Sequence, residues 1–154
     1  MIEEIYNELS KIAKEEYADI IVLIENPHGK LRLHIIDESY LDIWFSRKIP
    51  GRYAYHWERR HINGTIYRHN NRPHQELKHM KTYPKHFHNG KDENVKESHI
   101  SNNPKTALRQ ILETIRQKIR KQFKIKNLRE NIEVNENEVI KLREKEKKRI
   151  EIQS

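Results

Sequence analysis

The chain has 154 residues, of which 34% are hydrophobic and 35% charged, and its formal net charge is +8. This length and composition supply one modest core, which argues against multidomain enzymes and large buried cofactor pockets. The absence of cysteine excludes disulfides, thiol catalysis and Cys-ligated zinc. The longest apolar run, residues 20–24, is too short to span a membrane, and the acidic start is unlike a signal peptide. We therefore expect a cytoplasmic protein without a membrane partner, with a Lys-, Ile- and Glu-rich composition typical of thermophiles or of AT-rich genomes.

The first third of the chain predicts a helix followed by strands. Apolar residues recur at helical spacing over residues 2–16. Residues 19–25 form an apolar, β-branched run that ends in a turn at residues 26–29. Residues 30–36 and 40–47 then alternate between apolar and polar positions, which predicts two paired strands with one buried face.

The next segment predicts a β-hairpin. Residues 52–60 alternate clearly, and the dipeptide Asn63-Gly64 is the strongest short hairpin signal in the chain. Residues 65–70 would then pair back on residues 52–60. If the turn has two residues, the register brings four polar and aromatic side chains to one face, namely His56, Glu58, Tyr67 and His69.

The remainder of the chain divides into three parts. Residues 71–103 contain two prolines and five histidines and look irregular. Asn103-Pro104 is a good helix start, and an apolar stripe follows it. Residues 127–138 are rich in Asn and Glu and interrupt this pattern, and residues 139–150 predict a short charged helix.

Together these patterns predict an α+β fold without internal repeats. We expect an antiparallel β-meander of about four to five strands, with N-terminal and C-terminal helices packed on one face and water on the other. Residues 1–126 would form this domain. Residues 127–154 would form a charged C-terminal extension that is mobile or docks on a partner.

Charge is distributed unevenly along the chain. Residues 1–50 carry 6 Lys and Arg against 10 Asp and Glu, whereas residues 105–126 carry 8 against 1. Such a basic segment indicates a polyanionic partner, most often nucleic acid, although charge runs are more commonly solvated faces. The basic helix would contact nucleic acid through Arg109, Arg116, Lys118, Arg120 and Lys121. A non-catalytic nucleic-acid-binding protein is therefore one functional hypothesis.

Histidine is concentrated in one stretch, because eight of the ten histidines lie between His56 and His99. Two segments are densest, residues 67–74 and residues 83–88. His86 and His88 are two residues apart, so in an extended segment both side chains point the same way. Each histidine taken singly is more commonly structural, but this clustering beside paired arginines indicates chemistry.

The chemistry that we favour is metal-independent cleavage of RNA. Histidine titrates near neutrality, so a pair of imidazoles can supply both a general base and a general acid. Arginine can hold phosphate through two hydrogen bonds, and tyrosine can stack on a base. The predicted catalytic residues are His74, His86, His88, Arg68 and Arg72, and the predicted base-stacking residues are Tyr67 and Tyr83.

The same histidines could instead bind a metal ion. His74, His86 and His88 together could hold Zn²⁺ or another divalent cation, and the protein would then be a metal-dependent hydrolase. The spacing of these histidines is not specific to metal ions, and no HExxH pattern is present. Our leading hypothesis therefore has no cofactor.

At the two histidine-rich segments the sequence resembles the TumE family of toxins from toxin–antitoxin systems. The family pattern Tyr-Arg-x-Asp-Asn-x-Pro-His-His corresponds to residues 67–75, and Phe-Pro-x-His-x-His corresponds to residues 83–88. The resemblance covers roughly residues 15–125 and includes the flanking strands. Asn70 stands where the family pattern has Asp, and Gln75 where it has His. Because an amide can be neither a general base nor an anionic ligand, either these positions are not essential or activity has been lost.

The resemblance carries functional implications. It implies a small α+β toxin that acts on RNA, and a cognate antitoxin encoded alongside, expected to be a helix-turn-helix protein. A further alternative is that the protein is an inactive member of the family with a structural role, held by its partner.

Overall fold

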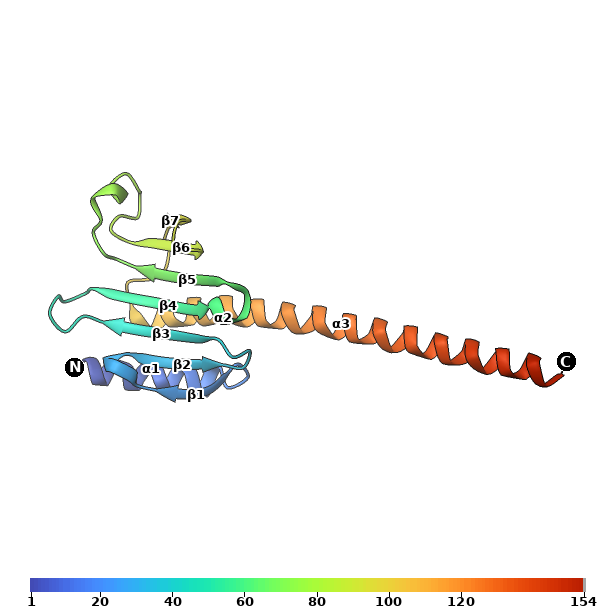
Figure 1. The fold of residues 1–154 in the computed structure, drawn as a ribbon. Coiled ribbons are helices and arrows are strands. Elements are labelled where there is room, and N and C mark those ends of the chain that lie inside the picture. Colours follow the sequence, from blue (N-terminus) through green and yellow to red (C-terminus); the bar gives the residue numbers. More distant parts are fainter. Residues whose placement is uncertain (154) are drawn as a thin grey trace. The chain divides into compact units, whose positions relative to one another are not determined.

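The computed structural model describes residues 1–153 and contains three α-helices and seven strands within that range (Figure 1). Two short 3₁₀ turns lie at Pro27–Gly29 and Gln75–Leu77. The helices and strands are, in chain order, α1 (Ile2–Glu16), β1 (Ile21–Glu25), β2 (Leu31–Ile35), β3 (Tyr40–Phe45), β4 (Tyr53–Arg59), α2 (Arg60–Asn63), β5 (Thr65–Asn70), β6 (His86–Gly90), β7 (Val95–Glu97) and α3 (Pro104–Gln153).

The strands form one antiparallel sheet in which every strand pairs with its neighbours in the sequence, in the order β1 to β7. This is the predicted meander, but the expected four to five strands were too few. The two additional strands, β6 and β7, lie within residues 71–103, which we had expected to be irregular. They are short and largely polar, so they lack the apolar alternation that predicts a strand.

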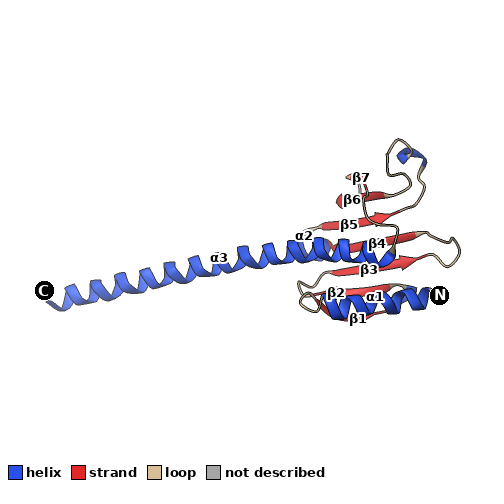
Figure 2. Cartoon of the chain, turned by 180° about the vertical axis from the view of Figure 1, so that it is seen from behind, coloured by secondary structure: helices blue, strands red, loops and turns tan. Residues whose placement is uncertain are grey.

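One face of the sheet is covered by α1 and by the first turns of α3 (Figure 2). The alternation of strand side chains sends apolar residues to this face from each central strand. Tyr6 of α1 ties the layers together, because its hydroxyl donates to the Gly29 carbonyl at 3.0 Å and accepts from the Phe45 amide at 3.3 Å. The buried residues of the core include Leu9, Ile12, Leu31, Leu33, Ile35, Leu41, Ile43, Tyr55, Trp57, Leu108 and Leu112.

The register of the β4–β5 hairpin differs from the one we expected. Trp57 lies opposite Tyr67 and Glu58 lies opposite Ile66. The connection is not a two-residue turn but the short helix α2, which ends at Gly64 in the left-handed conformation with φ of 78°. The resulting shift is an odd number of residues, and it exchanges the faces of β5. His56 and Glu58 therefore share a face with Arg68, and Tyr67 and His69 lie on the opposite face.

The last element, α3, is one uninterrupted helix over Pro104–Gln153. The predicted interruption at residues 127–138 was wrong, because that segment contains neither Pro nor Gly and its Asn and Glu residues are compatible with a helix. By compactness the chain divides into residues 1–114 and residues 115–154. The predicted boundary near residue 126 stays a prediction.

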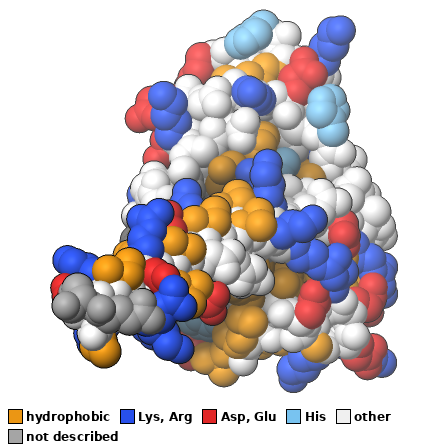
Figure 3. Space-filling model, turned by 90° about the vertical axis from the view of Figure 1, so that its right-hand side faces the viewer, with side chains coloured by type: hydrophobic (Ala, Val, Ile, Leu, Met, Phe, Trp, Pro, Cys, Tyr) orange, Lys and Arg blue, Asp and Glu red, His pale blue; other side chains and the backbone are white. Residues whose placement is uncertain are grey.

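No helix within residues 1–153 combines the length and the apolar character needed to cross a membrane. On the molecular face drawn in Figure 3, Lys and Arg side chains are interspersed with Asp and Glu side chains. A similar mixture of charges is present in the sequence of residues 127–154, which carry seven basic and seven acidic side chains.

Candidate functional site

The face of the sheet opposite α1, here called the open face, collects the predicted catalytic residues together with the adjoining loop. Strand register sets two neighbouring rows across it. The first row runs from β3 to β6 through Trp44, Ala54, Asn70 and His86. The second row runs beside it through Asp42, His56, Arg68 and His88. Residues that are far apart in sequence are thereby placed on one polar surface.

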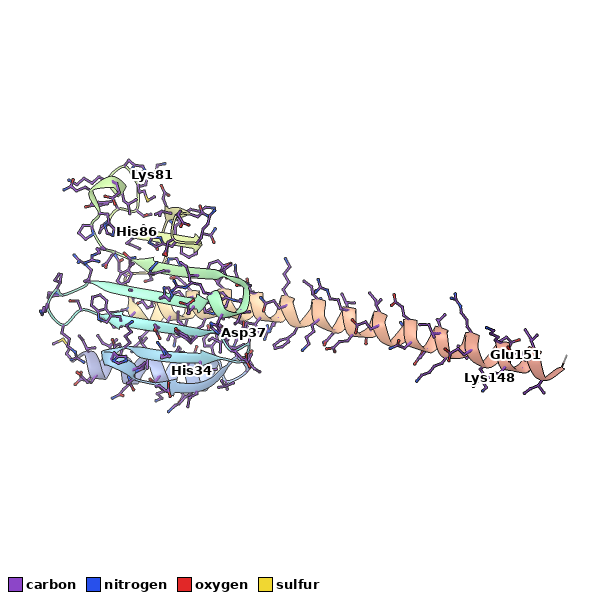
Figure 4. All side chains as sticks on the ribbon, in the orientation of Figure 1. His34, Asp37, Lys81, His86, Lys148 and Glu151 are labelled. Carbon is purple, nitrogen blue, oxygen red and sulfur yellow. The ribbon has the colours of Figure 1, made fainter. Side chains whose placement is uncertain are left out.

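Three histidines meet at one end of these rows. His86 and His88 project from β6 to the same side, with their ring centroids 5.2 Å apart. The loop between β5 and β6 brings in His74, whose ring centroid is 5.7 Å from that of His86. Figure 4 labels His86 on β6 and Lys81 on the loop that precedes it. Both contacts are edge to face. Because His74 and His88 each contact His86, the ring of His86 lies between the other two.

His86 differs from its two neighbours in burial. Its side chain is 1% exposed, and Nδ1 lies 3.0 Å from the Pro84 carbonyl oxygen. Burial lowers the pKa of His86, and the nearby His88, His74 and Arg68 add to this effect. A neutral ring that donates from Nδ1 to Pro84 leaves a lone pair on Nε2. This buried Nε2 has no hydrogen-bond partner among residues 1–153.

His88 and Arg68 are linked through Asp92 in the turn that follows β6. The Nδ1 atom of His88 lies 2.8 Å from the Asp92 main-chain oxygen, which leaves Nε2 as the ring nitrogen open to a reacting group. Arg68 pairs with the Asp92 carboxylate and holds the pKa of that group below its usual value. The buried Nε of Arg68 has no hydrogen-bond partner in the part of the chain that the structure describes.

A groove of about 490 Å³ lies directly beside the histidines. Among the residues of its lining are His74 and His88 together with three arginines, Arg52, Arg68 and Arg72. No Asp or Glu side chain lines it within residues 1–153, so the groove is cationic apart from the pairing of Arg68 with Asp92. The groove lining is Trp44, Ser46, Ile49, Arg52, Tyr53, Ala54, Arg68, Asn70, Arg72, His74 and His88.

A second groove adjoins the first and shares Trp44, Ala54 and Arg68 with it. Its carboxylates are engaged by arginines within the lining. Arg32 donates to both oxygens of Asp42 at 2.7 and 2.9 Å. The Nε of Arg60 lies 3.0 Å from Glu58 and, with other hydrogen bonds, lowers the pKa of Glu58 to about 2. The second groove is therefore polar, and its lining carries four cationic side chains, Lys30, Arg32, Arg60 and Arg68, against these two paired carboxylates.

The predicted stacking tyrosines lie outside both grooves. Tyr67 is on the helix-covered face, with its ring centroid 5.3 Å from that of Trp57 and 6.3 Å from that of Phe87. Its direction follows from the corrected hairpin register, which pairs Tyr67 with the core residue Trp57 and Arg68 with His56. Tyr83 lies half-buried in the loop before β6.

The basic residues predicted to contact nucleic acid all lie on α3. Arg109 is half exposed and makes a two-point ion pair with Glu16, at 3.0 and 2.8 Å. In the second unit, Arg120 and Lys121 are exposed, whereas Arg116 and Lys118 are partly buried.

The geometry also identifies residues that the sequence analysis missed. Trp44 is not among the predicted site residues, but it is 36% exposed and borders both grooves. The alternation of β3 contained the signal, because Leu41 and Ile43 face the core and residue 44 must face away. Asp92 and Arg52 had no local signal, since only the β6–β7 turn and the sheet register bring them here.

The described residues contain no preformed cluster of metal ligands, which bears on the metal hypothesis. Among residues 1–153, no three or more His, Asp or Glu side chains are arranged to hold one metal ion. The binding of Zn²⁺ by His74, His86 and His88 stays a prediction that a chelator can test.

Comparisons with known proteins give one finding. The family model described as "Toxin TumE" matches residues 6–119. Searches of curated proteins and of solved structures found no match. The matched segment contains the whole sheet and all three histidines of the cluster.

Proposed function

The chain belongs to the TumE toxin family, and from this premise we propose that it acts on RNA by metal-independent acid–base cleavage. Membership in the family makes it a toxin of a toxin–antitoxin system, whose partner is a cognate antitoxin. We propose further that the antitoxin is a helix-turn-helix protein. The observation that carries the RNA proposal is the meeting of three imidazoles at a groove lined by three arginines.

The proposed reaction is transfer within the RNA strand. The ribose 2′-oxygen attacks the adjacent phosphorus, and the bond from phosphorus to the 5′-oxygen of the next nucleotide breaks. The products are a 2′,3′-cyclic phosphate and a free 5′-hydroxyl. One imidazole takes the proton of the 2′-hydroxyl, and a second, protonated imidazole gives a proton to the departing 5′-oxygen.

Burial divides the three histidines between two roles. His74 is exposed and His88 is partly exposed, and both line the groove, so these two would exchange protons with RNA. His86 is buried between them, and its lowered pKa keeps it neutral near pH 7. We assign His86 a positioning role, in which its edge-to-face contacts hold the other two rings.

The arginines would stabilise the charge that develops at phosphorus. The exposed Arg72 lines the groove and is available to a phosphate, and Arg68 is held in place by Asp92. Preorganised donors of this kind act on the transition state because they need not reorient during the reaction. Asn70 fits this assignment, because its side-chain oxygen accepts the Arg72 amide at 3.0 Å and thus shapes the loop without needing a charge.

The test is RNA integrity after incubation with purified full-length protein, with and without a chelator. We expect cleavage that resists the chelator and yields 2′,3′-cyclic phosphate ends. His88→Ala and His74→Ala should each slow cleavage by roughly 10²-fold or more. His99→Ala is the matched control, because His99 is 76% exposed and outside the groove, and it should cleave as wild type. The double variant His86→Ala/His88→Ala should be inactive.

Other outcomes would favour a different functional hypothesis. Cleavage that stops on addition of chelator and returns with Zn²⁺ would favour the metal-dependent hydrolase. If no variant and no wild-type sample cleaves RNA, the acid–base proposal fails. The remaining hypothesis would then be binding through the basic helix at residues 105–126, measured as an affinity that falls steeply with salt and survives loss of the histidines.

A further inference from the structure

Trp44 occupies a position that the reaction proposed above does not use. It ends the first cross-strand row, opposite Ala54, and it lines both grooves. A tryptophan packed for stability would be expected on the helix-covered face, where Trp57 is 2% exposed and donates from Nε1 to the Ser39 hydroxyl at 2.8 Å. Trp44 instead presents its indole ring at the junction of two polar grooves, where a flat ligand could stack on it.

The two grooves differ in charge. The first is lined by Arg52, Arg68 and Arg72 without a carboxylate in its described lining, so it attracts phosphate. The second carries two carboxylates, Asp42 and Glu58, among its four cationic side chains, and each carboxylate is paired with an arginine. These carboxylates make the second groove less favourable to phosphate than the first, and the paired groups offer hydrogen bonds to an uncharged nucleobase. A strand of RNA could therefore place its backbone in the first groove and a base toward the second.

The spacing of the strands agrees with such a placement. Trp44 is three strands from His86 along one row, which corresponds to roughly 14 Å at about 4.8 Å per strand. The two residues between them, Ala54 and Asn70, have small side chains and line the first groove. An extended strand could thus reach from the histidines to the indole without obstruction by a large side chain.

From these observations we propose that Trp44 is a stacking platform for a nucleobase next to the cleaved bond, and that the site therefore selects single-stranded RNA. The bases of a duplex are already stacked and paired, so their faces are not available to an indole. This inference rests on the proposed function in that it takes RNA as the ligand, but it does not require cleavage. Specificity would come from Trp44 and proton transfer from His74 and His88.

Tryptophan fluorescence tests the proposal directly, since Trp44 and Trp57 are the two tryptophans in the chain. The probe is a 2′-O-methyl RNA oligonucleotide, which has no 2′-hydroxyl and cannot be cleaved by the proposed route. We expect single-stranded probe to quench the emission of the full-length protein, and the same sequence as a duplex to leave it unchanged. Trp44→Leu should abolish the quenching and weaken binding roughly 5- to 150-fold.

Two further variants separate stacking from folding. Trp44→Phe keeps an aromatic face and should bind within a few-fold of wild type. Phe123→Leu removes an aromatic side chain of similar exposure on α3 and should change nothing. Equal weakening by Trp44→Phe and Trp44→Leu, with unchanged thermal midpoints, would overturn stacking. So would equal affinity of the wild type for duplex and single strand.

The two proposals fail in different ways. If wild-type protein does not cleave RNA but binds the single strand through Trp44, the acid–base mechanism fails and the stacking site is supported. If the protein cleaves duplex and single strand equally well and Trp44→Leu cleaves both as wild type does, the stacking site is overturned and the cleavage mechanism stands. Binding of the probe by His88→Ala at wild-type affinity would also support the separation of stacking from proton transfer.

Discussion

The two faces of this sheet are built from the same strands and have opposite properties. In β3, Leu41 and Ile43 are fully buried against the helices, whereas Tyr40, Asp42 and Trp44 face the grooves. In β4, Tyr55 and Trp57 face the core, and His56 and Glu58 face the open side. Alternation thus lets one strand contribute apolar residues to stability and polar residues to binding, with little competition between the two.

The comparison has one informative exception on the helix-covered face. Arg59 is 2% exposed, pairs with Asp37 at 3.1 Å, and lies with its guanidinium carbon 4.6 Å from the centre of the Trp57 ring. A buried arginine needs such partners, because an unpaired buried charge is strongly destabilising. The covered face therefore tolerates charge only where the charge is compensated, whereas the open face displays it toward the groove.

The largest expected effect is a difference between the two faces in how much a substitution lowers the free energy of unfolding. Leu33→Ala removes a fully buried side chain from the covered face and should lower the free energy of unfolding by about 3 kcal/mol, measured by denaturant titration. Trp44→Leu on the open face should change it by less than about 1 kcal/mol. A loss at Trp44 as large as the loss at Leu33 would show that both faces are part of one packed core and would break the comparison.

An intermediate effect comes from His69, which the corrected register places on the covered face. Burial, with a contribution from Lys85, lowers the pKa of His69 to about 4. Its ring stacks on Phe87 at 4.2 Å, and Nδ1 lies 2.8 Å from the Ser98 hydroxyl. The unfolded chain binds a proton at His69 more tightly than the folded chain does. The free energy of unfolding is therefore largest above about pH 6.5 and falls progressively as the pH falls toward 4.

Protonation of His69 should lower the free energy of unfolding by about 2 kcal/mol at pH 5. His69→Asn should remove that part of the pH dependence when unfolding is measured at pH 7 and at pH 5. His99→Asn, which changes an exposed histidine, should keep the wild-type dependence. If His69→Asn and wild type lose the same free energy between these pH values, His69 is not buried in a neutral form.

The smallest effect concerns the ion pair on the open face. Asp42→Asn removes the charge that holds Arg32 and should cost about 1 kcal/mol of stability, since Arg32 remains partly solvated. The same change makes the second groove more cationic. It should therefore tighten binding of the 2′-O-methyl RNA probe at low salt, with a gain that disappears as salt rises. Weaker binding by Asp42→Asn would indicate that the carboxylate itself contacts the base.

Local sequence patterns were sufficient for much of the fold. The apolar period of residues 2–16 predicted α1 with its observed bounds, alternation predicted β2, β3 and β4, and the hairpin signal predicted β5, each strand close to its observed bounds. The predicted α+β class with an antiparallel meander is confirmed. These features depend on the period of apolar residues, which is visible in a short window because helices and strands repeat every few residues.

Patterns longer or subtler than that window were missed. The polar strands β6 and β7 carry no apolar alternation, and the continuity of α3 depends on the absence of helix breakers rather than on a positive signal. At the site, spacing alone predicted that His86 and His88 point the same way. It gave no reason for His74 to join them, because that requires the loop between β5 and β6 to fold back.

The sequence by itself thus determined which residues could carry the chemistry, since residue type and spacing fix the available imidazoles and guanidiniums. Only the tertiary structure decided which face each of them occupies. A five-residue connection at residues 60–64, in place of a two-residue turn, placed Arg68 on the open face and Tyr67 in contact with the core. The physical reason is that strand side chains have a period of two, so an odd shift in register exchanges every side chain between core and groove.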